Sequence, residues 1–93
     1  MLDFARPLQL DLKVVDIRVT IRRAGESCRT KADARSVVLT MHLPSTPVTT
    51  AIDSSHIERA LINLIDNAVD ASPPGTVVTI TAAIDGNYIA IHH

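Results

Sequence analysis

The spacing of apolar residues along the chain predicts two helices and four strands. In chain order these are a helix at residues 17–34, strands at 37–43 and 48–52, a helix at 56–71, and strands at 77–84 and 88–91. The helices are assigned because apolar residues recur every three to four positions, and the strands because apolar and polar residues alternate. Asp16 is placed to cap the first helix, and either Asp53 or Ser55 can cap the second. We therefore expect an α+β fold with two helices on one face of a mixed sheet of about four strands.

The last two strands are expected to form a hairpin. Asp85-Gly86 lies between them, and this dipeptide is a strong signal for a two-residue turn. With Ile84 opposite Asn87 the apolar faces of the two strands coincide, which supports this register. The other expected pairs are Ala82 with Ile89, Ile80 with Ile91, and Val78 with His93.

The first fifteen residues have a less regular pattern. Pro7 cannot continue a helix interior, so we expect a short helix over residues 1–5 and a linker or extended arm over residues 6–15. Apolar residues at every second position from Leu8 to Val14 are also compatible with an edge strand. A loosely attached tail and a docked segment are both consistent with this stretch.

The helix at residues 56–71 has its polar residues gathered on one side. Six polar side chains fall within an arc of about 100° on a helical wheel, and apolar residues take most of the rest. The six, which we call the polar stripe, are His56, Arg59, Asn63, Asp66, Asn67 and Asp70. A surface helix usually has the opposite proportion, so we expect this helix to be buried on most sides. Glu58 is the one acid in the apolar sector, and a capping box with Ser55 would account for it.

Asn63 and Asn67 are the candidate ligand-binding residues of the stripe. They lie one helical turn apart, so their side chains point into the same space. A carboxamide oxygen accepts hydrogen bonds from water and ligates hard cations, and magnesium bound with a nucleotide needs few protein ligands. On spacing alone, the more common alternative is that two such asparagines cap the helix or satisfy buried backbone groups.

Residues 58–71, with the core Asn63-Leu64-x-x-Asn67-Ala68, resemble the N box of sensor histidine kinases, within the GHKL superfamily. Residues 2–7 resemble the end of the second helix of the dimerisation and phosphotransfer domain, and residues 51–53 the run before the N box helix. The resemblance implies that residues 1–15 are the end of the dimerisation helix and a linker. It also implies that residues 16–93 are a truncated ATP-binding (HATPase) domain, with part of the two-layer Bergerat sandwich.

The resemblance assigns a role to three residues. Asn67 would ligate magnesium on the ATP phosphates, and Asn63 would take the catalytic position that activates or polarises water. Asp70 would be a third cofactor-binding residue near the phosphates, where many relatives carry a basic or small residue. The family's Asp-x-Gly-x-Gly motif and its phosphoacceptor histidine motif are absent from these 93 residues. We therefore expect this chain alone to bind Mg-ATP weakly or not at all.

Composition and charge exclude several other classes of function. A chain of 93 residues with 46% hydrophobic residues fits one small globular domain. A net charge of −1 gives no electrostatic case for nucleic acid or an anionic membrane as partner. The single cysteine, Cys28, permits no internal disulfide, fits a reducing cytoplasm, and is expected to pack as a small hydrophobe. No apolar run is long enough to span a bilayer, so any inner-membrane anchor of a parent protein would lie outside this segment.

Two hypotheses from different classes follow. In the first, the chain is a fragment of a two-component sensor histidine kinase, whose parent autophosphorylates a histidine from ATP. Its partners would be Mg-ATP, its own dimerisation domain and a response regulator that receives the phosphoryl group in a phosphorelay. In the alternative, the chain is a non-enzymatic interaction module that keeps the GHKL scaffold without ATP binding. Such a module would pair with another chain, or with itself as a homo-oligomer, through an open sheet edge.

Overall fold

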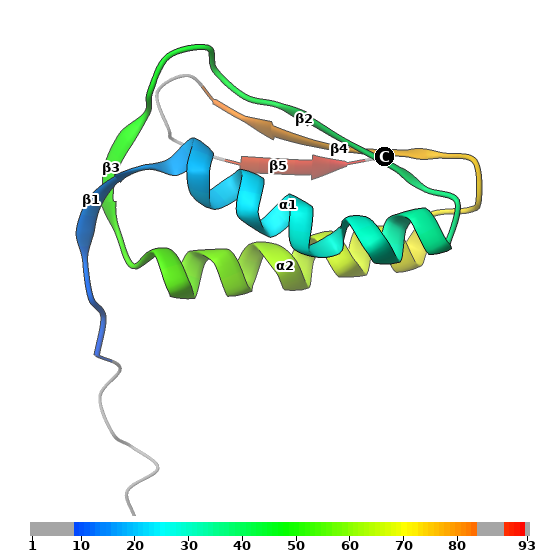
Figure 1. Ribbon diagram of the computed structural model, residues 1–93, viewed down its shortest axis with the longest axis horizontal. Coiled ribbons are helices and arrows are strands. Elements are labelled where there is room, and N and C mark those ends of the chain that lie inside the picture. The colour runs from blue at the N-terminus through cyan, green and yellow to red at the C-terminus, as the bar shows by residue number, and fades with distance from the viewer. Residues whose placement is uncertain (1–8, 84–88, 93) are drawn as a thin grey trace, which may run out of the picture.

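The computed structural model shows two helices on one face of a sheet, with a separate pair of strands at one end (Figure 1). The structure describes residues 9–83 and 89–92. Over these residues the elements are β1 (Lys13–Asp16), α1 (Ile17–Ala34), β2 (Val38–His42), β3 (Thr49–Ile52), α2 (Ser54–Ala71), β4 (Val77–Ala82) and β5 (Ile89–His92). Each of the six predicted elements is present, and the predicted α+β class is confirmed.

The strands are arranged in two sheets, which differs from the predicted mixed sheet of about four strands. Within the described residues, β2, β4 and β5 form a mixed sheet in which β2 is parallel to β4 and β5 is antiparallel to it. β3 instead pairs antiparallel with β1. The reason lies just before β3, where the Ile17 amide donates to the Val48 carbonyl (2.9 Å). This bond holds the start of β3 against the start of α1 and directs the strand along β1.

The segment before α1 was expected to be a linker or extended arm, with an edge strand as the other option. The structure shows a strand over Lys13–Asp16, so the edge-strand option is confirmed for these residues. The helix expected over residues 1–5 lies outside the described residues. The predicted hairpin register is confirmed by the pairs Ala82 with Ile89 and Ile80 with Ile91. The Asp85-Gly86 turn, the pairing of Ile84 with Asn87 and that of Val78 with His93 lie outside the described residues.

The core lies between the helix pair and the inner face of the three-stranded sheet. Its largest fully buried side chains come from α1, α2 and β4: Ile21, Cys28, Ile65, Val69, Val78 and Ile80. The predicted alternation of β2 is also confirmed, because Val37 and Leu39 are buried while Val38 is exposed. One face of the sheet and one side of each helix are therefore packed together, as a two-layer fold requires.

Two turns at one end of the molecule set the register of the parallel strands. The turn after α1 contains Ser36, and the turn after α2 contains Gly75 with a left-handed φ of 85°. The Gly75 amide donates to the Ser36 carbonyl (2.7 Å), and the Val38 amide donates to the Thr76 carbonyl (2.9 Å). Since the two turns bond to each other, β2 and β4 start side by side, and this is why Val38 pairs with Val77.

α2 is less buried than its sequence predicted. Only Leu61, Ile65 and Val69 are buried along it, and Leu64 is 55% exposed. The expectation of a helix enclosed on most sides is therefore wrong for the described structure. The physical reason is that α1 and the sheet together cover one side of α2, and no other described element covers the rest.

Asp16 joins β1, α1 and the loop before β3. Its Oδ1 accepts the Arg18 amide (3.1 Å) as the predicted N-cap of α1, and it also accepts the Val48 amide (3.3 Å). The Arg18 guanidinium binds both carboxylate oxygens and also donates to the Pro44 carbonyl. The hydrogen bond from the Arg18 side chain is the main reason that the pKa of Asp16 is lowered to about 2.

Replacing Ile65 and its neighbour Leu64 separates the packed side of α2 from its exposed side. Ile65→Ala removes a fully buried side chain, and we expect it to lower the free energy of unfolding by about 3 kcal/mol. Leu64→Ala is the matched control on the same helix and should change it by no more than about 0.5 kcal/mol. Urea unfolding followed by circular dichroism measures both. Equal losses for the two variants would contradict the described orientation of α2.

The lowered pKa of Asp16 predicts a specific dependence of stability on pH. A carboxyl group whose pKa falls on folding stabilises the folded state above its ordinary pKa, and this contribution is lost as pH falls towards the folded value. For Asp16 the window runs from about pH 4 down to about pH 2. We expect Asp16→Asn to unfold at a lower temperature than the wild type at pH 7, and the difference to shrink across this window. A difference in unfolding temperature that stays constant from pH 7 to pH 2 would show that the ionised form of Asp16 does not stabilise the folded state.

Candidate functional site

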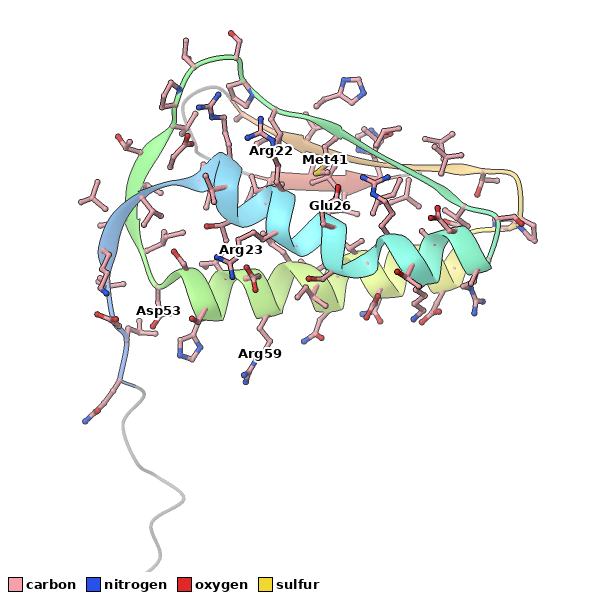
Figure 2. All side chains as sticks on the ribbon, in the orientation of Figure 1. Arg22, Arg23, Glu26, Met41, Asp53 and Arg59 are labelled. Carbon is pink, nitrogen blue, oxygen red and sulfur yellow. The ribbon has the colours of Figure 1, made fainter. Side chains whose placement is uncertain are left out.

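The N-terminus of α2 is capped by Asp53, which was one of the two predicted caps. Its Oδ1 accepts the His56 amide (3.2 Å), and its Oδ2 accepts the Asp11 amide (2.8 Å). These backbone hydrogen bonds, with that from Asp11 the larger, lower the pKa of Asp53. The Ser55 capping box is not formed, because the Glu58 carboxylate binds Arg23 of α1 instead (3.0 Å). Figure 2 shows Arg23 between the two helices and Asp53 at the start of α2.

Asn63 and Asn67 lie on the outer, exposed face of α2. Arg59, one turn earlier on the same face, points away from α1 and from the sheet (Figure 2). Neither asparagine side chain has a hydrogen-bond partner within residues 9–83 and 89–92. The common alternative of asparagines that satisfy buried backbone groups therefore does not apply here. The two carboxamides are instead open to a ligand that approaches this face.

The acidic residues of the polar stripe face α1. The Lys31 ammonium lies 2.9 Å from Asp70 Oδ1 and 4.0 Å from Asp66 Oδ1, and Arg35 lies 3.6 Å from Asp70. The hydrogen bond from Lys31 is the main cause that lowers the pKa of Asp70. The stripe is therefore divided into an amide half that faces solvent and a carboxylate half that is ion-paired with α1. Sequence reasoning missed Lys31 and Arg35, because the register between two helices cannot be deduced from either helix alone.

Cys28 is a packed residue, as predicted. It is buried under α2, and its thiol lies 3.7 Å from the Ile62 carbonyl. Burial is the main cause that raises the pKa of this thiol to about 11. A thiol that stays protonated at neutral pH is a poor nucleophile and a poor metal ligand.

A cavity of about 460 Å³ lies away from the asparagines, between β1 and the first turns of both helices. It is lined by Val15, Asp16, Val19, Thr20, Arg23, Ser54, Ser55 and Glu58. None of the three predicted site residues lines it. Among the residues that the structure describes, no three His, Cys, Asp or Glu side chains are grouped to hold a metal ion. Neither described helix is long and apolar enough to cross a membrane.

Sequence relatives of the chain are sensor kinases. Sensor protein CreC of Escherichia coli K12 is 30% identical over 80 residues, which are 86% of this chain and 16% of CreC. Sensor histidine kinase MtrB of Mycobacterium tuberculosis H37Rv is 31% identical over 89% of this chain and 14% of MtrB. The chain thus spans about one sixth of the length of these relatives. No family model matches it.

Solved structures of histidine kinases share the fold. Full-length ShkA, crystallised in complex with AMPPNP, is 28% identical with a TM-score of 0.74 over 90% of this chain and 18% of ShkA. The catalytic domain of ThkA matches in fold alone, with 19% identity and a TM-score of 0.72 over 78% of this chain and half of that domain. In sequence and in fold, the chain therefore corresponds to a part of the catalytic domain of sensor histidine kinases.

Proposed function

We propose that α2 supplies the magnesium and phosphate side of an ATP site in a two-component sensor histidine kinase. Asn67 would coordinate the magnesium ion carried by the nucleotide, and Asn63 would position or polarise water beside the phosphates. The observation that carries this proposal is the pair of exposed carboxamides one turn apart on a helix whose opposite side is anchored in the core. Magnesium usually keeps waters and phosphate oxygens as its other ligands, so one amide oxygen is a sufficient protein contribution.

Asp70 has a different part in this proposal from the two asparagines. Its carboxylate already binds Lys31 and Arg35, so a phosphate near Asn67 would meet a carboxylate whose charge is balanced. Balancing matters because an isolated carboxylate would repel the phosphates of the nucleotide. We therefore keep Asp70 as a neighbour of the cofactor and assign direct contact to Asn63 and Asn67.

The chain covers only part of its relatives, so the activity of the whole protein is also a proposal. We propose that the parent autophosphorylates a histidine from ATP and passes the phosphoryl group to a response regulator in the cytoplasm. ShkA in complex with AMPPNP and ThkA in complex with the response regulator TrrA support the two kinds of partner. We also propose that residues 1–15 precede a catalytic-domain part at residues 16–93. β1 crosses that boundary, which makes the end of the linker part of the fold.

The isolated 93-residue chain should bind Mg-ATP no more tightly than millimolar. The reason is that α2 supplies the magnesium side alone, while the glycine-rich loop that usually surrounds phosphates is absent from the sequence. Isothermal titration calorimetry measures the affinity. Micromolar binding that is lost in Asn67→Ala would show that this short chain holds a complete nucleotide site.

Paramagnetic line broadening tests the placement of the metal at these weak affinities. With Mn-AMPPNP added to the ¹⁵N-labelled chain, we expect the side-chain amides of Asn63 and Asn67 to broaden before other signals. Asn67→Ala should abolish the selective effect, whereas Leu64→Ala, on the same exposed side, should keep it. Mn-EDTA is the control for contacts that need no nucleotide. Broadening centred on other residues, such as the acidic side chains near α1, would contradict the proposed site.

The alternative of an interaction module is favoured by one observation, the open edges of the three-stranded sheet. β2 and β5 each have a single neighbour among the described strands. Such an edge is a template for strand addition. If this alternative holds, the mass measured by light scattering should double between micromolar and millimolar concentrations of the chain. A constant monomer mass over that range would count against it.

A further inference from the structure

Residues 9–16, which we call the strap, are attached to the fold mainly through their backbone up to Val15, and through the Asp16 side chain at their end. β1 pairs with β3 over four residue pairs, from Lys13 with Ile52 to Asp16 with Thr49 (Figure 1). The apolar side chains of the strap are largely open to solvent: Leu10 is 51%, Leu12 59% and Val14 74% exposed. A segment held by exposed backbone hydrogen bonds with few buried contacts opens at low cost in free energy. The strap up to Val14 is therefore the kind of element that can detach while Asp16 stays at the start of α1 and the core stays folded.

Asp53 connects this strap to α2. The two oxygens of its carboxylate accept from two different backbone amides, one of which lies 42 residues earlier in the chain. Oδ2 accepts the Asp11 amide of the strap, and Oδ1 accepts the His56 amide in the first turn of α2. The side chain is only 11% exposed, so few other orientations are open to it while both partners are in place.

We propose that Asp53 couples the strap to the first turn of α2, so that detachment of the strap loosens the start of that helix. With the strap attached, donors on both sides fix the carboxylate in its capping orientation. When the strap is detached, the Asp53 side chain can adopt other rotamers. The hydrogen bond from the His56 amide to Asp53 is then weaker, because forming it must also fix the Asp53 side chain at a cost in conformational entropy. The coupling is a free energy between two sites and must therefore act in both directions. An effect of this coupling on nucleotide binding through Asn63 and Asn67 rests on the proposed function. The coupling between the strap and α2 does not.

Substitutions at Asp11 test the coupling from the side of the strap. Asp11→Pro removes the amide proton that Asp53 accepts and leaves α2 untouched, and Asp11→Ala keeps that amide as the matched control. In hydrogen exchange of the 93-residue chain, we expect Asp11→Pro to speed exchange at residues 54–58 by about two- to fivefold. Asp11→Ala should leave exchange there unchanged. Amides around Ala24 in the middle of α1 should exchange as in the wild type, which shows that the core is intact.

Substitutions at His56 test the coupling in the opposite direction. His56→Pro removes the amide proton that Asp53 accepts as the cap of the helix. His56→Ala keeps that amide and removes the imidazole, whose Nε2 lies 3.8 Å from Asp53 Oδ2. We expect His56→Pro, and not His56→Ala, to speed exchange at residues 13–16 by a similar factor. This pair also decides the matter if Asp11→Pro unfolds the chain.

Two results would overturn the coupling. One is equal exchange at residues 54–58 in Asp11→Pro and Asp11→Ala, with a core as protected as that of the wild type. The other is a loosened first turn of α2 in His56→Pro while residues 13–16 stay fully protected. Because neither readout uses a nucleotide, failure of the coupling is distinguishable from failure of the proposed ATP site.

Discussion

The packing of Ile21, Ile65 and Ile80 is the interaction on which the rest of the structure depends. One residue comes from each of α1, α2 and β4, and all three are completely buried. The burial of these side chains in one core cluster fixes both helices against the same face of the sheet, so it also fixes how each helix is rotated about its own axis. The rotation of α2 has a functional consequence. With Ile65 turned inward, the opposite side of the helix, which carries Asn63 and Asn67, must face away from the core.

Charged residues refine this arrangement at the two ends of the helix pair. At one end, Asp16 and Asp53 cap the two helices and at the same time bind backbone amides that lie far away in sequence. At the other end, Lys31 and Arg35 bind Asp70 across the helix pair. These contacts are exposed or partly exposed, so they add little energy compared with the core. Their effect is to decide which polar groups remain available, and this is how the amides become separated from the carboxylates.

The sequence predicted the elements well because each of them has a regular period. Asp16 as a cap, the alternation around Leu39 and the pairing of Ile80 with Ile91 all depend on local pattern or on a short hairpin, and all are confirmed. The sequence did not predict that β1 and β3 form a separate two-stranded sheet, since this pairing depends on the long-range hydrogen bond between Ile17 and Val48. Periodicity specifies which face of an element is apolar, but not which distant element it will meet.

The candidate site was predictable to the same extent. The spacing of Asn63 and Asn67 placed them on one face, and the structure shows that face exposed. The burial of α2 was overestimated because an apolar sector can be wider than the area that neighbouring elements cover, as the exposed Leu64 shows. The ion pairs of Asp70 could not be foreseen either, because they require the register between α1 and α2. The roles of the asparagines in magnesium and phosphate binding stay predictions.

The most direct test of this account compares the reactivity of two thiols in one molecule. In the variant Asn67→Cys, the introduced thiol lies on the exposed face of α2, and the native Cys28 lies under the helix. Labelling with a thiol reagent, followed by peptide mass spectrometry, measures both rates under native conditions. We expect the introduced thiol to react as fast as a free thiol and Cys28 to react only as fast as the chain unfolds. Similar rates at the two sites, or a protected thiol at position 67, would contradict it.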